Sequence, residues 1–360
     1  MAGKALASFA DFVTATNERV LTDPKDIISD AVSRTYAIRD MLKGKGESDV
    51  VKSGATITER IQLSATTQFG FYDPNEQFTP SVEDVLTKTS LNWRFAKDAW
   101  AWTDHELKLN EGDRLTQFKN LRDSKRMACT ISLYNGMEAA LWATPDASTM
   151  ESSGTGGRPY SIRAFLTEDG NAPAGFSTLM GVDPTAANKS RWKNQVANYA
   201  YGSIDSTLPA ALEAIWRKCK FESPDSKDNY FRETKFNKFK IYTNMDGWQT
   251  YVRLTRNAND RAMSSKGPDL GAFVDAPMFG GIPLSWIEAL DGVGYPIGQP
   301  RFFFVNFEYL YPIFHSERYM YETDPINGGH TQPYSWVVYK DCWYNLFCRS
   351  RYRQGMVVPV

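Results

Sequence analysis

The stretch ITERIQLSATTQFGF, residues 57–71, carries apolar or small side chains at its odd-numbered positions and mostly polar ones at the even positions, with Glu59 as the main exception. The same alternation resumes in VLTKTSLNWRF, residues 85–95, after a turn-like segment at 73–76. A period of two is typical of β-strands. We therefore expect residues 56–104 to form one long two-stranded β-arm.

The length of this arm bears on what the chain does. Each limb, of about 12–16 residues, would extend roughly 40–50 Å, whereas ordinary strands have about 5–6 residues. A compact chain of 360 residues is itself only about 50 Å across, so the arm can lie on its own domain only in part. The simplest consequence is that the arm projects and packs on a neighbouring subunit, which points to an assembly protein.

The alternation changes phase near the end of the arm. Leu91, Trp93 and Phe95 occupy odd positions, whereas Trp100 and Trp102 take over at even positions. Such a change is typical of a β-bulge or of a passage from one packing surface to another.

Composition sets the broad class of the protein. Hydrophobic residues make up 42% of the chain, which is enough for a sizeable core and two or three lobes. The net charge of −1 does not indicate a nucleic-acid-binding surface, although a neutral total can hide a one-sided face. Residues 1–21 lack the apolar region of a signal peptide, and no apolar run reaches the length of a membrane span. We expect a soluble protein that does not bind membranes and is cytoplasmic at synthesis.

The four cysteines, at positions 129, 219, 342 and 348, form no C-x-x-C pair and no cluster with histidine. Since helical and aromatic patterns surround them, we expect four free, buried thiols in a reducing compartment.

Helix and strand patterns continue beyond the arm. Residues 24–42 form an amphipathic pattern that predicts a helix ahead of the arm. A helix near 30 residues long is expected at 111–143, where Pro145 stops it. The other expected elements are a helix at 208–219, a strand at 237–241, a helix at 247–254 and two aromatic strand groups at 301–311 and 334–353.

No local pattern predicts catalysis, a cofactor or a metal site, and we expect the chain not to be an enzyme. The histidines, His105, His315 and His330, are isolated from one another in the sequence. Residues 154–157 lack the Gly-Lys-Ser/Thr ending of a phosphate loop and read as a flexible linker. Residues 183–188 read as a turn, because they lack calcium-loop spacing.

Asp104 and Glu106 are expected on one face of an exposed strand end.

The sequence shows two further patterns with a structural and a functional interpretation. Arg349, Arg351 and Arg353 alternate with other residues and would share one face of a strand. That face is either solvated, or forms an ion-pair row between subunits or a surface against packaged nucleic acid. The aromatic run at 302–314 could stack on sugars or bases, but a continuous apolar run fits a buried strand better.

Several phrases, taken with the order of elements, resemble the major capsid proteins of tailed bacteriophages, which have the HK97-like fold. The order is helix arm, long β-arm, long helix, Gly-rich link, α/β lobe and aromatic strands. The phrases are Gly181-Val182-Asp183 followed by Ser190-Arg191-Trp192-Lys193-Asn194-Gln195, Lys238 to Trp248, Pro277 to Pro283, and Arg349 to Gly355.

The resemblance implies an α+β, HK97-like capsid fold with four parts. These are an N-terminal arm at 1–50, an extended β-arm or E-loop at 51–108, a peripheral domain at 109–169 and 301–360 with a long spine helix, and an axial domain at 170–300. It also implies self-assembly into pentamers and hexamers of an icosahedral shell that encloses viral double-stranded DNA. The virion would be its location, after assembly in the host cytoplasm.

Partners and covalent links follow from the same resemblance. Fewer than about 60 residues precede the β-arm, which leaves no room for a large fused scaffolding domain, so a separate scaffolding protein or none is implied, together with a portal. Some relatives crosslink subunits through an arm lysine. Lys88 lies on this arm, but no catalytic carboxylate or acceptor can be matched, so no crosslink is assigned.

Two alternatives remain open at this stage. An encapsulin-like compartment shell of the same fold would enclose an enzyme in place of DNA. A carbohydrate-binding or carbohydrate-active protein would use the aromatic residues as its surface, but a monomeric enzyme offers nothing on which to lay the long arm.

Overall fold

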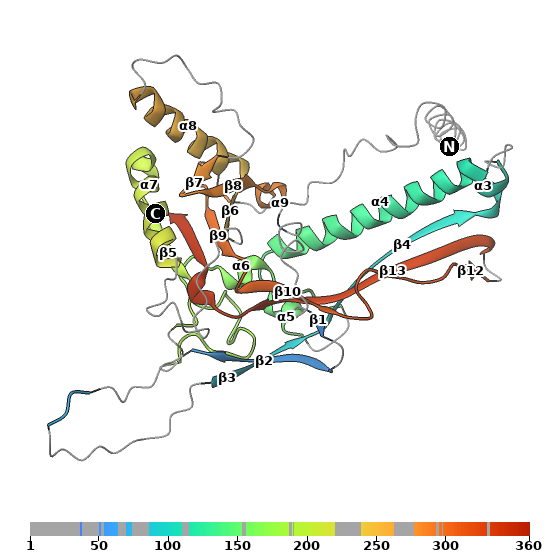
Figure 1. Ribbon diagram of the computed structural model, residues 1–360, viewed down its shortest axis with the longest axis horizontal. Coiled ribbons are helices and arrows are strands. Elements are labelled where there is room, and N and C mark those ends of the chain that lie inside the picture. The colour runs from blue at the N-terminus through green and yellow to red at the C-terminus, as the bar shows by residue number, and fades with distance from the viewer. Residues whose placement is uncertain are drawn as a thin grey trace. The chain divides into compact units, whose positions relative to one another are not determined.

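Figure 1 shows the computed structural model as a ribbon. Its chain divides into two compact units. The structure describes residues 37, 50–51, 54–63, 70–73, 86–109, 115–152, 156–186, 189, 191–219, 239–262, 277–292, 295–296, 298–329 and 332–360. The first unit contains residues 95–137 and 317–343, and the second contains residues 36–94, 138–316 and 344–360, each as far as described.

The first unit is built on strand β13, with which three shorter strands pair. The unit's elements are β4 (Arg94–Thr103), α3 (Asp104–Leu109), α4 (Leu115–Trp142), β11 (Tyr321–Glu322), β12 (Ile326–Gly328) and β13 (Gln332–Cys348), where β4, β11 and β12 pair with β13. The boundary between the units falls within α4 and within β13.

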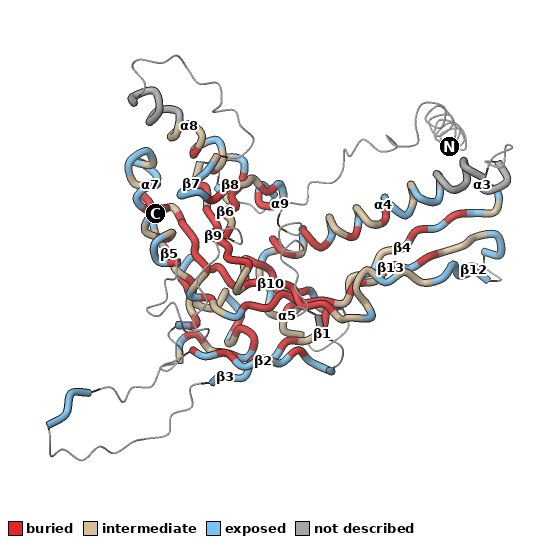
Figure 2. Tube along the Cα trace, viewed as in Figure 1, coloured by how far each residue is buried: buried red, intermediate tan, exposed pale blue. Residues whose placement is uncertain are grey.

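Side chains of β4 and β13 alternate between a covered and an open face of this sheet. Val338 is buried, whereas its neighbour Tyr339 is 49% exposed. Trp100 and Trp102 of β4 pack together with Val338 and with Cys129 of α4. Helix α4 therefore covers one face, and the alternating burial along β4 and β13 can be followed in Figure 2.

The second unit contains a mixed six-stranded sheet in the order β5-β14-β9-β6-β8-β7. Its strands are β5 (Gln195–Tyr199), β6 (Phe239–Thr243), β7 (Met278–Phe279), β8 (Ile282–Trp286), β9 (Phe302–Asn306) and β14 (Gly355–Pro359). Its helices include α5 (Ala147–Met150), α6 (Ile162–Phe165), α7 (Ile204–Cys219), α8 (Met245–Ala262) and α9 (Glu288–Asp291), with short 3-10 turns at Tyr201–Ser203 and Arg351–Arg353.

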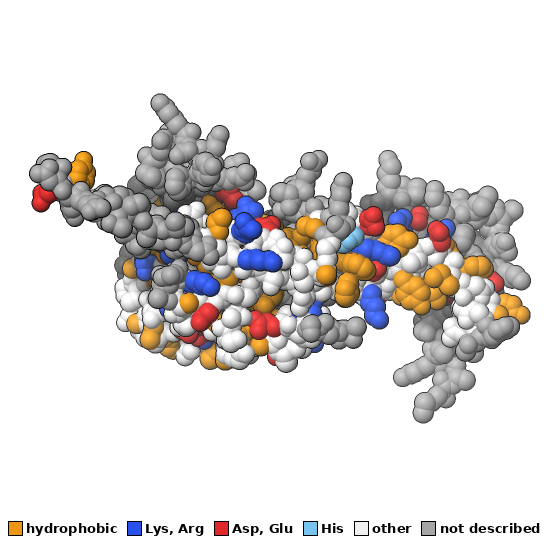
Figure 3. Space-filling model, turned by 90° about the horizontal axis from the view of Figure 1, so that it is seen from below, with side chains coloured by type: hydrophobic (Ala, Val, Ile, Leu, Met, Phe, Trp, Pro, Cys, Tyr) orange, Lys and Arg blue, Asp and Glu red, His pale blue; other side chains and the backbone are white. Residues whose placement is uncertain are grey.

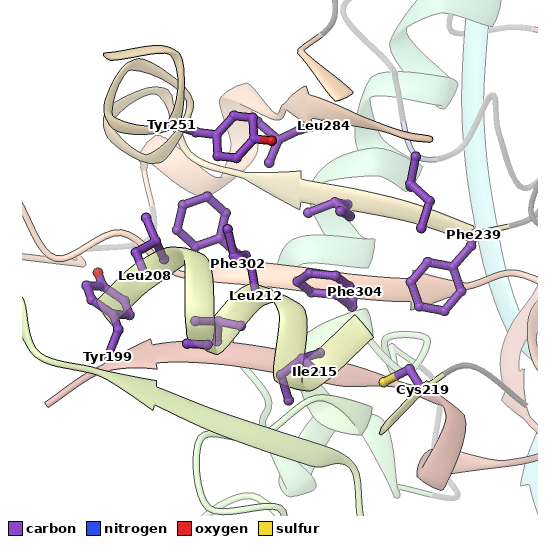
Figure 4. Close-up of a cluster of buried hydrophobic side chains, with 14 residues drawn as sticks. Tyr199, Leu208, Leu212, Ile215, Cys219, Phe239, Tyr251, Leu284, Phe302 and Phe304 are labelled. Carbon is purple, nitrogen blue, oxygen red and sulfur yellow. The ribbon is translucent and has the colours of Figure 1, made fainter. Parts of the chain in front are cut away.

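The core of this unit lies between α7 and the sheet. Leu212 and Ile215 of α7 point toward Phe302 and Phe304 of β9 (Figure 4), and all four side chains are fully buried. Helix α7 presents an apolar stripe at helical spacing to the sheet, which is the pattern of an amphipathic helix.

Two small strand groups complete the second unit. Strand β1 (Val50–Val51) runs parallel to β10 (Leu310–His315), which pairs antiparallel with the end of β13. Strands β2 (Thr56–Gln62) and β3 (Leu86–Asn92) form a separate two-stranded antiparallel hairpin.

Most elements predicted from the sequence are confirmed. The long helix extends over Leu115–Trp142, and the helix predicted at 208–219 begins earlier, at Ile204. The helix predicted at 24–42 lies outside the described residues, apart from Ala37, which is helical. Within the described part of the chain, no helix is long and apolar enough to span a membrane.

Candidate assembly surfaces

The β2–β3 hairpin confirms the period-two prediction over seven cross-strand pairs. The ladder runs from Thr56 opposite Asn92 to Gln62 opposite Leu86. Odd-numbered side chains face inward: Ile57, Ile61 and Leu91 are at most 3% exposed. The rest of the predicted limbs, at 64–69 and 74–85, lies outside the described residues.

Glu59, the exception in the sequence pattern, links the hairpin to the rest of the second unit. Its Oε2 accepts a hydrogen bond from Arg349 Nη2 at 3.3 Å and one from Tyr311 Oη at 3.5 Å. Its carbonyl accepts from the Thr89 hydroxyl across the ladder at 2.9 Å. A charged residue on the inward face is thus explained by partners on β10 and beyond β13.

Residues 90–94, which run from the end of β3 to the first residue of β4, are held by further polar contacts; we call this segment the root of the hairpin. Ser90 N–H donates to Met180 O at 3.2 Å, and Trp93 Nε1 donates to Gly54 O at 2.9 Å. Asn345 Nδ2 donates to Asn92 O at 2.7 Å. These directional bonds fix the orientation of the root more tightly than apolar contact alone would.

Two aromatic side chains in the segment that joins β2 to β3 are almost fully exposed. Phe71 is 95% exposed and Tyr72 80%. Large aromatic side chains at such exposure are the residue types that anchor protein–protein interfaces. We treat this part of the hairpin as the first candidate assembly surface.

The prediction of one continuous arm over 56–104 is wrong at its C-terminal end, from Arg94 onward. Strand β4 pairs with β13 and not with the hairpin, so the arm ends at β3. The phase change seen in the sequence marks this passage: Trp93 and Arg94 are buried in succession, after which Trp100 and Trp102 are buried at even positions.

The open face of the first unit's sheet is a second candidate surface. Phe95 is 58% exposed and its ring lies edge-on to Trp343 at 4.8 Å. The guanidinium of Arg318 lies over the rings of Tyr321 and Trp343, at 4.7 and 5.6 Å from their centroids. Figure 3 shows hydrophobic side chains interspersed with Lys and Arg on one face of the molecule. Trp, Tyr and Arg are the residue types enriched at interface hot spots.

Asp104 and Glu106 were expected on a strand, but they lie in the first turn of α3, so this prediction is wrong. Thr103 Oγ1 accepts from Glu106 N–H at 3.2 Å, while Glu106 Oε2 accepts from Thr103 N–H at 3.1 Å. This reciprocal arrangement is a capping box, which ends β4 and starts the helix. Glu106 also pairs with Lys125 at 2.7 Å, so its role is structural.

The predicted arginine row on one strand face is also wrong. Strand β13 ends at Cys348, and Arg351–Arg353 form a 3-10 turn. Arg349 is exposed and pairs with Glu59, whereas Arg351 is fully buried. The two arginines therefore have separate environments and cannot form a common ion-pair row or nucleic-acid surface.

Arg351 joins three segments of the second unit. Its guanidinium donates to Phe165 O at 2.9 Å, Trp192 O at 3.0 Å and Asn171 O at 2.9 Å. Asn194 Oδ1 accepts a further bond at 3.1 Å. Burial lowers the pKa of Arg351 to about 10. The sequence carries no local signal for this residue, because its acceptors lie more than 150 positions away.

The two histidines that the structure describes lie on different elements. His105 is exposed on α3, and the ring of His315 on β10 lies edge-on to Trp93 at 5.5 Å; His330 is outside the described residues. No group of three His, Cys, Asp or Glu side chains that could hold a metal ion occurs among the described residues.

The cysteine prediction is confirmed as to burial, since all four thiols are free and buried. Desolvation raises the pKa of Cys129 to about 11 and that of Cys219 and Cys348 to about 12, so these thiols are unreactive at neutral pH.

Three smaller predictions have clear outcomes. The run Phe302–Phe304 is buried core, as the apolar pattern indicated. Asp183 Oδ1 accepts from both the N–H and the hydroxyl of Thr185, which makes the predicted turn. Lys88 lies exposed on β3 opposite Arg60, so its predicted place on the arm is confirmed, while the absence of a crosslink stays a prediction.

Comparison with known proteins gives a fold. No family model matches the sequence, and no curated protein matches it significantly. Among solved structures, the cyanophage A-1(L) capsid asymmetric unit is similar over 93% of this chain and 98% of its own, with a TM-score of 0.55 and 10% identity.

Two further structures agree. The capsid of an empty GTA particle is similar over 92% of this chain and 98% of its own, with a TM-score of 0.50 and 9% identity. A structure of Mycobacterium phage Bobi is similar over 94% and 95%, with a TM-score of 0.50 and 9% identity. The predicted likeness to capsid proteins is confirmed at the level of the fold: this chain has a mixed α/β fold similar to that of the two capsid structures.

Proposed function

We propose that this chain is a structural, non-enzymatic subunit that self-assembles into a capsid shell. The observation that carries the proposal is the β2–β3 hairpin, whose root is fixed by directional hydrogen bonds while Phe71 and Tyr72 remain almost fully exposed. In an isolated subunit, exposed aromatic side chains contribute no free energy of apolar burial to folding. A neighbouring copy that covers them removes this cost and gains an interface.

The finer architecture is part of the proposal. The hairpin would act as the E-loop of an HK97-like fold and α4 as its spine helix. Residues 1–50 would form the N-terminal arm, 109–169 with 301–360 the peripheral domain, and 170–300 the axial domain. The likeness in fold to capsid structures supports this assignment without fixing the boundaries.

The partners follow from the same reading. We infer pentamers and hexamers of this chain, a separate scaffolding protein or none, a portal, and double-stranded DNA inside the shell. The virion is the inferred location, after assembly in the host cytoplasm. Neither an encapsulin-like role nor carbohydrate binding is favoured by a specific residue arrangement, and the aromatic run proposed for stacking lies in the core.

A deletion tests the proposal. The described ladder ends at Gln62 opposite Leu86, so a short Gly-Ser turn can replace residues 64–85 without touching β2 or β3. The deleted chain should keep its circular dichroism spectrum and melting temperature, yet fail to form closed shells in electron microscopy. The intact chain, expressed alone or with its scaffold, should form shells or capsomer rings.

A second variant tests the aromatic contacts without shortening the hairpin. F71S with Y72S keeps the hairpin but removes both exposed aromatic side chains, and should weaken assembly in light scattering. A deletion that unfolds the chain would show that the segment is internal core. Shells of unchanged stability in the deletion would show that the hairpin is not an interface.

A further inference from the structure

Arg94 occupies the end of the hairpin root and is only 3% exposed. Its Nη2 donates to Met150 O at 2.5 Å and to Ser152 O at 2.8 Å. Asn92 Nδ2 also donates to Ser152 O, at 3.3 Å. Two side chains of the root therefore converge on one short segment, at the end of α5 and just beyond it.

The contacts of Arg94 are not those of a residue that serves folding stability alone. Both acceptors are neutral carbonyl oxygens, and burial lowers the pKa of the guanidinium. Its Nε has no hydrogen-bond partner among the described residues. Replacing buried charges by apolar side chains of similar volume is often neutral or stabilising. A rigid planar fork, by contrast, fixes the direction of whatever it holds.

Gly157 packs directly against the guanidinium of Arg94. A Cβ at that position would lie 1.9 Å from Arg94 Nη1 and 2.5 Å from its Cζ. A side chain at this position would therefore displace the guanidinium of Arg94. The sequence interpretation of 154–157 as only a flexible linker is corrected at this residue, because Gly157 packs against a buried arginine.

We propose that Arg94, packed against Gly157, is a positioning residue that sets the direction in which the β2–β3 hairpin extends from the rest of the second unit. The inference rests on the proposed function, since a fixed hairpin direction matters where the hairpin must meet a neighbouring copy. It adds a specific pair of residues that determines the geometry of assembly.

The test measures hairpin direction in the unassembled chain. Spin labels at K88C on β3 and N198C on β5 sit at two exposed positions of the second unit. The four native thiols are buried, so labelling is directed to the introduced ones. Pulsed electron spin resonance then gives the distribution of distances between the labels for the parent, R94K, G157A and R351K. R351K is the matched control, because it makes the same change at a buried arginine that also donates to carbonyl oxygens.

The parent and R351K should each give a single narrow distance peak. R94K and G157A should lose that peak and give a broad or displaced distribution, and their shells should be malformed in electron microscopy. The inference is overturned if R94K and G157A keep the parent's peak, or if R351K broadens it equally, because the effect would then be general loosening. A parent chain that forms no shells would count against the proposed function but would leave this distance comparison valid.

Discussion

Replacing Arg351 by Met should destabilise the second unit substantially. The guanidinium is fully buried and donates to three backbone carbonyls, Phe165 O, Trp192 O and Asn171 O. A buried acceptor that loses its donor costs about 1–3 kcal/mol, so three of them cost a gross 3–9 kcal/mol or so. Removing the arginine also removes its own desolvation penalty, which is several kcal/mol. The net loss should be roughly 2–4 kcal/mol in the free energy of unfolding.

The assay is urea unfolding of the unassembled chain, together with hydrogen exchange of the backbone amides. The loss should appear as a lower denaturation midpoint and as faster exchange at 165–171 and 192–194, where the acceptors lie. R351K should fall between the parent and R351M, because an ammonium keeps the charge but has three donors on a flexible stem.

A loss below about 1 kcal/mol in R351M would refute this reasoning, because it would mean that water or backbone rearrangement satisfies the freed carbonyls at little cost. Unchanged exchange at the two loops would have the same meaning. The outcome would then place Arg351 among buried polar residues that contribute little to stability.

Three further outcomes follow from the described contacts. Burial opposes ionisation of Glu322, but hydrogen bonds from Arg126 and Lys340 outweigh it and hold the pKa of Glu322 below its usual 4.5. The stability that this carboxylate contributes is present above that value and is lost as pH falls through the lower folded pKa, so E322Q should flatten the acid side of a plot of melting temperature against pH. An equally steep plot would contradict the assignment. Mass spectrometry of the denatured chain without reductant should find four reduced thiols, and a bridge would show that burial does not protect them. T103A should cost about 0.5–2 kcal/mol in urea unfolding through loss of the capping box, whereas no change would show that Glu106 and Lys125 hold the helix end alone.

The sequence predicts local features well because their causes are local. Burial of Ile57, Ile61 and Leu91 follows from the period of two, since neighbouring side chains of any strand point to opposite faces. The long helix and the buried aromatic strand are equally decided by periodicity and by apolar content. These predictions require no knowledge of the partner elements.

The failures concern partners that are distant in the sequence. Strand β4 alternates as well as the hairpin does, but alternation cannot tell that its partner is β13, more than 200 residues later. Arg351 reads as one member of an alternating row, and only its carbonyl acceptors at 165–192 show that it is buried. Capping at Thr103 was detectable, because Thr followed three residues later by Glu is a capping-box pattern.

The chemistry of the hairpin also bears on how an unassembled chain avoids premature association. A two-stranded ladder has two edges, and edge backbone groups that lack a partner invite pairing with other chains; on β3, Ser90 N–H already donates to Met180 O. Arg60 and Lys88 face each other across the exposed side of this ladder. Like charges directly opposite each other weaken the pair slightly, but they repel a second identical hairpin far more than a differently charged surface. The Arg60–Lys88 pair therefore disfavours stacking of two identical hairpins on this face of the ladder.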